Sequence, residues 1–177
     1  PHFIDYMIVN YYTGNEDWAH HNWYASRHRS PEGRWRFHSW DAEGMLGRGL
    51  GENRVNQTGG ALGGLIASLR RIEEFRVRYA DRIHKHLFND GLLTPGVNID
   101  RLNRLTAPID RAVVGESARW GDGRWDQVNP ARTRDDHWLP RLESLREDYF
   151  PRRGDRVLDQ FRAIDLYPDT EAPELNR

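Results

Sequence analysis

Cysteine is absent from this chain of 177 residues. Its absence excludes disulfide bonds, thiolate metal sites and cysteine nucleophiles. Lysine is almost absent, because Lys85 is the one lysine among 26 basic residues. Many phosphate-transferring enzymes hold their nucleotide with a specific lysine, so this scarcity limits where such a group can lie. No stretch of about 18 apolar residues occurs, so the sequence predicts no transmembrane helix.

Large aromatic side chains are plentiful, with seven Trp, seven Tyr and six Phe. They argue against a fully disordered chain, although the mean hydropathy is only −0.87 and 30% of residues are charged. The length is that of one ordinary domain. A net charge of −1 predicts no nucleic-acid partner and no attraction to an anionic membrane.

The two ends of the sequence suggest a longer parent chain. Pro1 is not an initiator methionine, and no charged segment followed by an apolar segment marks a signal peptide. We therefore expect a piece of a longer protein or a processed one. Residues 168–177, rich in proline and acidic residues, are expected to form a linker to a following domain.

The first forty residues predict a helix followed by a β-hairpin. Apolar residues at helical spacing over residues 3–12 predict a helix, and Gly14 is placed to end it. Residues 15–22 are polar and predict a loop. Two strand-like runs flank a strong turn signal at residues 30–33, so we expect a hairpin over residues 22–40.

The rest of the sequence predicts mainly helices. Eight of the sixteen glycines lie in residues 42–64, where we expect a long loop. Further along, the spacing of apolar residues predicts helices over residues 65–90, 99–119, 135–149 and 156–164. Thr94 and Pro95 are expected to form a small turn, and residues 121–132 a polar loop. Pro151 is expected to break the helix over 135–149. The expected fold class is α+β, mainly helical, with a short hairpin.

Asp17 and Asn22 form a D-x-x-x-x-N pattern in the predicted loop, and Asp41 follows the hairpin. In a kinase catalytic loop, this spacing lets the Asp accept a hydroxyl proton while the Asn binds Mg²⁺, and a second Asp completes the metal site. Asp5 and Asn10 match the same pattern, but inside a helix their side chains point to different faces. Asp17, Asn22 and Asp41 can equally cap a turn, start a strand and end one. Spacing alone leaves both interpretations open.

Other polar residues favour structural roles. His20 and His21 are adjacent and do not easily face one metal, so we expect loop or substrate-side histidines rather than zinc ligands. His84 and His86 lack ligand spacing and are expected to be surface or packing groups. The arginines of residues 70–82 alternate with acidic residues, which is typical of a solvated helix face with ion pairs.

Two further sets carry expectations that the structure can test. Arg152 and Arg153 follow Pro151 and are expected to be a solvated loop pair. Four tryptophans bracket the candidate site, and we expect most of them in the core and the others exposed where a further lobe would pack: Trp18, Trp23, Trp35 and Trp40.

The string FIDYMIVNYYTGNEDWAHHNWYASR, followed by GRWRFHSWDAE, resembles the CotH (spore-coat protein H) kinase family. RIHKHLFNDGLLTP, ESARWGD and YFPRRGDRVLDQFRAIDLYP are similar to its bacterial, multidomain branch. The resemblance covers residues 2–168 and is most specific in the first 43. It implies a protein-kinase-like fold that transfers phosphate from ATP to protein hydroxyls with Mg²⁺, usually outside the cytoplasm in the cell envelope.

The resemblance also assigns roles to residues of this sequence. Asp17 would be the catalytic aspartate, and Asn22 and Asp41 would hold the Mg²⁺ of ATP. Glu43 would be an additional metal ligand. His21 departs from the pattern, because the family often has Asn at that position.

The glycine-rich segments match neither a kinase phosphate loop nor a P-loop, and Lys85 comes after the metal aspartate. We therefore expect a C-terminal lobe without its N-terminal lobe, inactive or nearly so alone. Residues 1–43 would carry the catalytic loop and hairpin, 44–64 a glycine-rich loop, and 65–167 the helical remainder. The alternatives are a non-catalytic envelope or adhesion module with this fold, and AMP transfer on the same scaffold.

Overall fold

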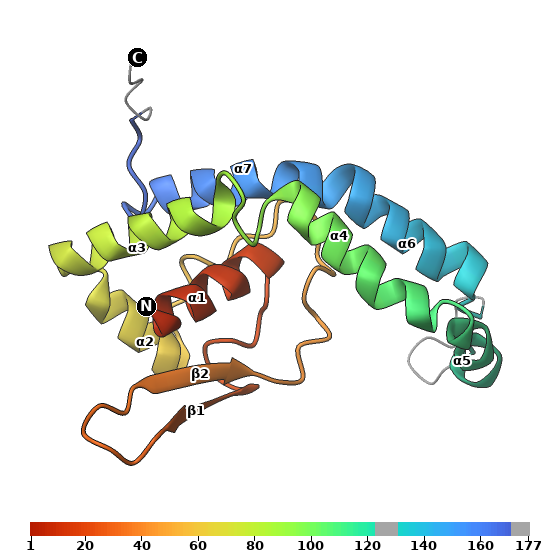
Figure 1. Ribbon diagram of the computed structural model, residues 1–177, viewed down its shortest axis with the longest axis horizontal. Coiled ribbons are helices and arrows are strands. Elements are labelled where there is room, and N and C mark those ends of the chain that lie inside the picture. The colour runs from red at the N-terminus through yellow and green to blue at the C-terminus, as the bar shows by residue number, and fades with distance from the viewer. Residues whose placement is uncertain (123–130, 171–177) are drawn as a thin grey trace.

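The computed structural model describes residues 1–122 and 131–170, which form a mainly helical unit with one two-stranded sheet (Figure 1). This confirms the mainly helical α+β class. Its elements are α1 (His2–Thr13), β1 (Trp23–Arg27), β2 (Trp35–Ser39), α2 (Gly60–Leu69), α3 (Glu73–Leu87), α4 (Pro95–Thr106), α5 (Ala112–Trp120), α6 (Leu139–Ser144) and α7 (Phe150–Arg162). A 3₁₀ turn, Ala107–Ile109, follows α4, and π-helical turns, Arg134–Trp138 and Leu145–Tyr149, flank α6.

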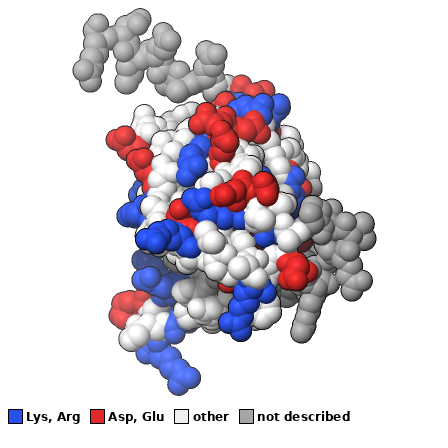
Figure 2. Space-filling view, turned by 90° about the vertical axis from the view of Figure 1, so that its right-hand side faces the viewer, with Lys and Arg blue, Asp and Glu red and all other residues white. Residues whose placement is uncertain are grey.

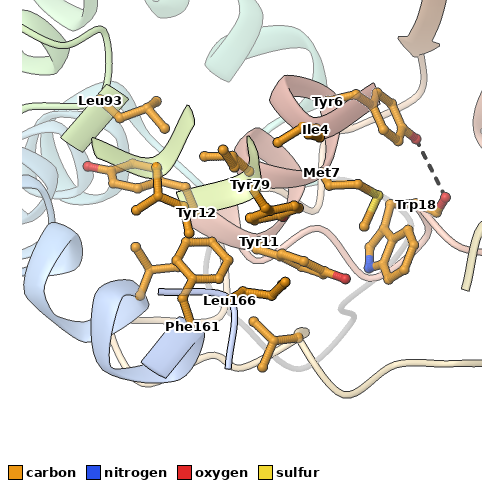
Figure 3. Packing of buried hydrophobic residues seen from close by; sticks show 14 of the residues in the cluster. Ile4, Tyr6, Met7, Tyr11, Tyr12, Trp18, Tyr79, Leu93, Phe161 and Leu166 are labelled. Carbon is orange, nitrogen blue, oxygen red and sulfur yellow. Dashed lines mark hydrogen bonds between the residues drawn. The ribbon is translucent and has the colours of Figure 1, made fainter. Parts of the chain in front are cut away.

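Helix α1 lies at the centre, with the hairpin on one side and α3 and α7 on the other (Figure 1). Six of its apolar and aromatic residues are buried and pack with side chains of α3 and α7 (Figure 3): Ile4, Tyr6, Met7, Ile8, Tyr11 and Tyr12. Gly14 ends the helix in the left-handed conformation, with φ 68°, as the sequence predicts. A helix buried around most of its circumference gives the loop that follows it a rigid starting point.

The predicted hairpin is present, with antiparallel pairing from Trp23 opposite Ser39 to Arg27 opposite Trp35. It packs on α1 through Phe37, whose ring lies 4.8 Å from Phe3 and 5.8 Å from Tyr6 between centroids. Aromatic pairs at these distances contribute beyond their buried area. The hairpin is thereby fixed against the helix that leads into the candidate site.

The prediction of one helix over residues 65–90 is wrong, because α2 and α3 are separate helices. The break at residues 70–72 is stabilised by tertiary contacts of Arg70, whose guanidinium donates to the carbonyls of Val55 (3.4 Å) and Ile164 (3.3 Å). Arg76 in turn donates to the Arg70 carbonyl across 3.1 Å. These bonds outweigh the local helical spacing.

Two neighbouring boundaries also differ from the prediction. The glycine-rich loop ends at residue 59, since α2 begins at Gly60 and buries Leu62 and Ile66. Residues 94–95 do not form an isolated turn: Thr94 precedes α4 and Pro95 occupies its first position. Proline suits that position because the missing N–H has no partner in the first turn.

Pro151 does not break the predicted last helices. Helical structure runs from Arg134 to Arg162 and contains two prolines, Pro140 and Pro151. Each proline is the second residue after the end of a π-helical turn. Proline normally clashes with the carbonyl four residues earlier, and a wider turn changes that geometry. The long helix therefore continues where the sequence predicts an end.

Arg153 corrects the expectation of a solvated arginine pair. It lies on α7 and is fully buried, with an exposed fraction of 0%. Its guanidinium donates to the carbonyls of Tyr11 (2.6 Å), Tyr12 (2.7 Å), Leu50 (2.8 Å) and Glu52 (2.9 Å). Burial lowers the pKa of this guanidinium from its ordinary value. The last-turn carbonyls of α1, which lack helical partners, are thus joined to the glycine-rich loop.

Among the four bracketing tryptophans, only Trp18 is fully buried, which contradicts the expectation that most lie in the core. Trp23 is half-buried, whereas Trp35 and Trp40 are each 57% exposed.

The surface carries interspersed acidic and basic side chains, as one face shows in Figure 2. Within residues 1–122 and 131–170, no helix is long and apolar enough to cross a membrane. Most of the expected loop 121–132 and of the expected linker 168–177 lies outside the described residues.

Candidate functional site

The predicted catalytic loop is a tight turn that leaves the C-terminal end of α1. Asn10 and Asn15 are both buried, and the side-chain amide of Asn15 donates to Asn10 Oδ1 across 2.6 Å. The oxygen of the same Asn15 amide accepts from the backbone N–H of Asp17 across 3.1 Å. Trp18 is fully buried, and the Tyr6 hydroxyl donates to its carbonyl across 3.5 Å (Figure 3). The backbone on both sides of Asp17 is therefore held by buried groups.

Asp17 and Asn22 are in direct contact. The side-chain amide of Asn22 donates to Asp17 Oδ2 across 3.1 Å. The other carboxylate oxygen, Oδ1, lies 3.1 Å from His21 Nε2. The Asp17 side chain is 27% exposed, so a substrate group can still approach it from solvent. A carboxylate oxygen has more than one acceptor position, so these contacts leave room for a further hydrogen bond.

Asp41 joins this pair through its backbone. The Asn22 amide nitrogen also donates to the Asp41 carbonyl across 3.2 Å. Asn22 and Asp41 both have left-handed backbone conformations, with φ 58° and 49°, which Asn and Asp tolerate better than most residues. The Asp41 and Glu43 side chains are exposed, and no contact in the described part of the chain draws them to Asp17. The structure thus joins Asp17 and Asn22 by their side chains, and Asp41 by its main chain.

His20 and His21 lie close together at the turn, although we expected that two adjacent histidines do not easily face one metal. The backbone N–H groups of both donate to the Asp17 carbonyl, each across 3.2 Å. This tight turn brings the two rings to 4.2 Å between centroids at a near-perpendicular angle. One ligand atom from each of Asp17, His20 and His21 lies within 4.8 Å of the others. Adjacency is compatible with convergence here, because both residues lie at the end of one tight turn closed on the Asp17 carbonyl.

The glycine-rich loop wraps around the turn at Glu16. Arg48 and Arg54 form ion pairs with the Glu16 carboxylate, and Gln57 donates to the Glu16 carbonyl across 3.0 Å. The hydrogen bond from Arg48 holds the pKa of the Glu16 carboxyl below its ordinary value. These contacts connect the loop to the residue that directly precedes Asp17.

The start of α2 supports the same turn from another side. The Leu62 N–H donates to the Ala19 carbonyl across 3.3 Å. Gly60 has φ +75°, and a Cβ there would lie 2.2 Å from the Ala19 carbonyl oxygen and 2.9 Å from the His20 Cα. Only glycine permits both this backbone conformation and this close approach. The Gly59-Gly60 pair is a sequence signal for this close contact between two backbone segments. No comparable signal in the sequence indicated that Arg153 is buried.

The structural roles expected for the second pattern match are confirmed. Asp5 forms a bidentate ion pair with Arg82, at 2.6 and 2.7 Å, and accepts from His86 Nε2 at 2.9 Å. Asn10 supports the turn through Asn15, as described above. Neither residue is directed to the candidate site, so the pattern match at Asp5 and Asn10 serves packing. His84 lies on the surface beside the Tyr167 hydroxyl, as expected.

The oxygen groups of the site suit a hard divalent cation. Asn22 has an amide oxygen, and Asp41 and Glu43 have exposed carboxylates, which are the donors that Mg²⁺ prefers. Both amide hydrogen bonds of Asn22 use its nitrogen, so its oxygen is not engaged by them. The chemistry of this donor set therefore fits a magnesium ion, while Asp17 has the partial exposure that a proton acceptor needs.

Comparison with known proteins identifies a family. The family model described as CotH kinase protein matches residues 1–145, which is most of the chain and includes the complete turn, the hairpin and α2 to α4. Neither a curated protein nor a solved structure matches. The match includes the most specific part of the resemblance, residues 3–43, and ends before its last string, residues 149–168. The chain therefore belongs to the CotH kinase protein family.

Proposed function

We propose that this chain carries the catalytic-loop part of a protein kinase that transfers the γ-phosphoryl group of ATP to a protein hydroxyl. The observation that carries the proposal is the hydrogen bond between Asn22 and Asp17 at the exposed side of a rigid turn. Membership of the CotH kinase protein family supports the same reaction. In kinases, an Asp and an Asn at this spacing share the work of positioning the hydroxyl and the metal.

Asp17 acts as the group that receives the substrate hydroxyl. Its carboxylate accepts a hydrogen bond from the hydroxyl and takes its proton as the oxygen bonds to the γ-phosphorus. The bond between that phosphorus and the β–γ bridging oxygen breaks, and ADP leaves with the electron pair. The hydrogen bond from Asn22 holds the carboxylate in one orientation, which keeps it aligned with the incoming hydroxyl.

Asn22 and Asp41 would hold Mg²⁺, with Glu43 as an additional ligand. Bound there, the ion would neutralise negative charge on the nucleotide phosphates. The Asn22 nitrogen fixes the amide by donating to Asp17 and to the Asp41 carbonyl, which leaves the amide oxygen on the opposite side of the group. Asn22 therefore couples the orientation of the proton acceptor to that of the metal ligands.

The nucleotide-binding lysine is proposed to come from outside residues 1–177, in a preceding lobe of the complete protein. Lys85 is exposed on α3, which follows the metal aspartate in the chain, and does not suit that role. The exposed faces of Trp35 and Trp40 provide apolar surface on the hairpin against which such a lobe can pack. By the same proposal the protein acts on protein substrates in the cell envelope.

The mass of the transferred group tests this proposal. The complete protein is incubated with Mg²⁺ and ATP, alone and with candidate substrates, beside Asp41→Ala and the control Asp100→Ala, which alters an exposed residue of α4. We expect the mass of one phosphate to be added, to be lost in Asp41→Ala and to be kept in Asp100→Ala. A mass gain of one AMP would replace phosphotransfer by nucleotide transfer at the same site. No gain, with no rise in melting temperature on adding Mg²⁺ and ATP, would support a non-catalytic module.

A further inference from the structure

We propose that Asp17, His20 and His21 form a binding site for Zn²⁺, and that zinc bound there inhibits the protein by occupying the Asp17 carboxylate. The binding site follows from the geometry of the turn. The inhibitory effect rests on the function proposed above, in which that carboxylate receives the substrate proton.

Three potential ligand atoms converge on one side of the turn. His21 Nε2 lies 3.1 Å from Asp17 Oδ1, and one ring nitrogen of His20 lies within 4.8 Å of both. Ligands about 2.0–2.2 Å from a tetrahedral zinc ion are roughly 3.3–3.6 Å apart. The distance from His21 to Asp17 is slightly shorter than this spacing, so a small rotation of either side chain reaches it, and rotation of the exposed His20 ring closes the remaining gap.

The backbone that carries these ligands is already fixed. Both histidine N–H groups donate to the Asp17 carbonyl, and Asn15 holds the Asp17 N–H. Between the ligands, Trp18 and Ala19 are fully buried, and α2 packs against Ala19 through Leu62. The ligands are therefore held by a preorganised turn, and binding requires side-chain rotation without refolding of the chain.

The chemistry of the three groups separates zinc from magnesium. Two imidazole nitrogens and one carboxylate are a typical zinc set, with the fourth position left for water or another ligand. Magnesium prefers oxygen ligands and binds imidazole poorly, so its proposed ligands are Asn22, Asp41 and Glu43. Both histidines are exposed, so the ion reaches them from solvent. The two metals would thus use neighbouring sets of residues, and the zinc set alone contains Asp17.

Inhibition follows from the sharing of Asp17. A carboxylate bound to zinc has lost much of its ability to accept a proton, and the ion with its fourth ligand stands where the substrate hydroxyl would approach. Zinc and substrate hydroxyl therefore compete for one group. Removing the histidines weakens the competing site and leaves Asp17 in place.

Zinc binding is measured first, by calorimetry on the complete protein in excess Mg²⁺ and without ATP, which would chelate zinc. We expect one tight zinc site, weakened about tenfold or more in His20→Ala, in His21→Ala and in the double variant. His28→Ala is the matched control, since it removes an exposed histidine of the hairpin turn outside the cluster, and it should bind zinc as the unaltered protein does. Co²⁺ provides a second readout, because its absorption spectrum reports a tetrahedral site. Equal zinc affinity in the double variant and the unaltered protein would overturn the proposed site.

Inhibition is measured second, as phosphotransfer rate at buffered free Zn²⁺. We expect the concentration for half inhibition to rise about tenfold or more in the double variant, in parallel with the loss of affinity. Zinc that binds to these residues without slowing the reaction would contradict the inhibitory role and the proton-accepting role of Asp17 together, and would leave the binding site standing. Absence of binding beside full phosphotransfer would overturn only the zinc proposal.

Discussion

The side-chain amide of Asn22 donates hydrogen bonds both to the Asp17 carboxylate, at 3.1 Å, and to the backbone carbonyl of Asp41, at 3.2 Å. One side chain therefore links the turn after α1 to the residue that follows the hairpin. Asn22 and Asp41 also hold left-handed backbone conformations on either side of the hairpin. The paired strands of the hairpin thus bring Asp41 back to Asn22, although 18 residues separate them in the chain.

Arg153 is predicted to be a main contributor to stability. Replacing it with methionine removes a charged donor from four carbonyls of α1 and the glycine-rich loop. The carbonyls of Tyr11, Tyr12 and Glu52 each keep one other donor, whereas the Leu50 carbonyl depends on Arg153 alone among the described contacts. Leaving a buried carbonyl without its hydrogen-bond donor costs about 1–3 kcal/mol. Urea unfolding of Arg153→Met should show this loss of unfolding free energy.

Arg152 is the matched control for that experiment. It is adjacent in sequence, but its side chain is 59% exposed and its ion pair with Asp148 lies on the surface. Exposed pairs are worth about 0–1 kcal/mol, so Arg152→Met should change the unfolding free energy little. Equal effects of the two substitutions would show that the buried network is not the source of the stability.

Gly60→Ala is predicted to disturb the turn that carries Asp17, His20 and His21. The new Cβ would overlap the Ala19 carbonyl oxygen, and the residue would have to keep φ +75°. Backbone strain of this kind costs about 1–3 kcal/mol, and the displaced turn should also lose phosphotransfer activity. Gly64→Ala lies in the same helix with open space around the new Cβ, and should stabilise the protein by about 0.5–1 kcal/mol. Thermal melting and the phosphotransfer rate of the two variants check this contrast, which a uniform response to both would contradict.

Stability is predicted to fall in acid through Asp5. Burial raises the pKa of this carboxyl, but the hydrogen bonds and charges of Arg82 and His86 outweigh burial, so the pKa lies below its ordinary value of 3.8. A lowered acidic pKa contributes stability that is present above 3.8 and lost as the pH falls through the folded value.

The test compares Asp5→Asn with the unaltered protein. The variant should be less stable at neutral pH, because Arg82 and His86 lose their charged partner, and the difference should shrink as the pH falls below 3.8. Unfolding free energies measured across this pH range provide the check. A difference that stays constant with pH would show that the ionised Asp5 is not the source of the effect.

The first forty residues were predictable because their signals are local. The helical apolar spacing around Met7, the glycine that ends α1, and the turn between the strands each act over a few residues, and the structure has all three. The proximity of Asp17 and Asn22 could also be anticipated from the sequence, because both residues lie in one short loop.

The missed features depend on contacts that are distant in the chain. Arg70 ends α2 by bonding to Val55 and Ile164, and Arg153 binds the end of α1, which precedes it by more than half the chain. Charge patterns along a helix cannot reveal which distant carbonyls need a donor. The predicted helix break at Pro151 was wrong because a π-helical turn precedes this proline, and its wider geometry lets the helix continue.

The rate of a single phosphotransfer turnover in Asp17→Asn tests the central claim most directly. Asparagine keeps the size of the side chain and removes its ability to take a proton, so ATP affinity should stay unchanged while the rate falls about 10²–10⁴-fold. Asp100→Asn, on the exposed face of α4, should keep the full rate. An Asp17→Asn protein that transfers phosphate as fast as the unaltered protein would contradict the assignment of Asp17 as the proton acceptor.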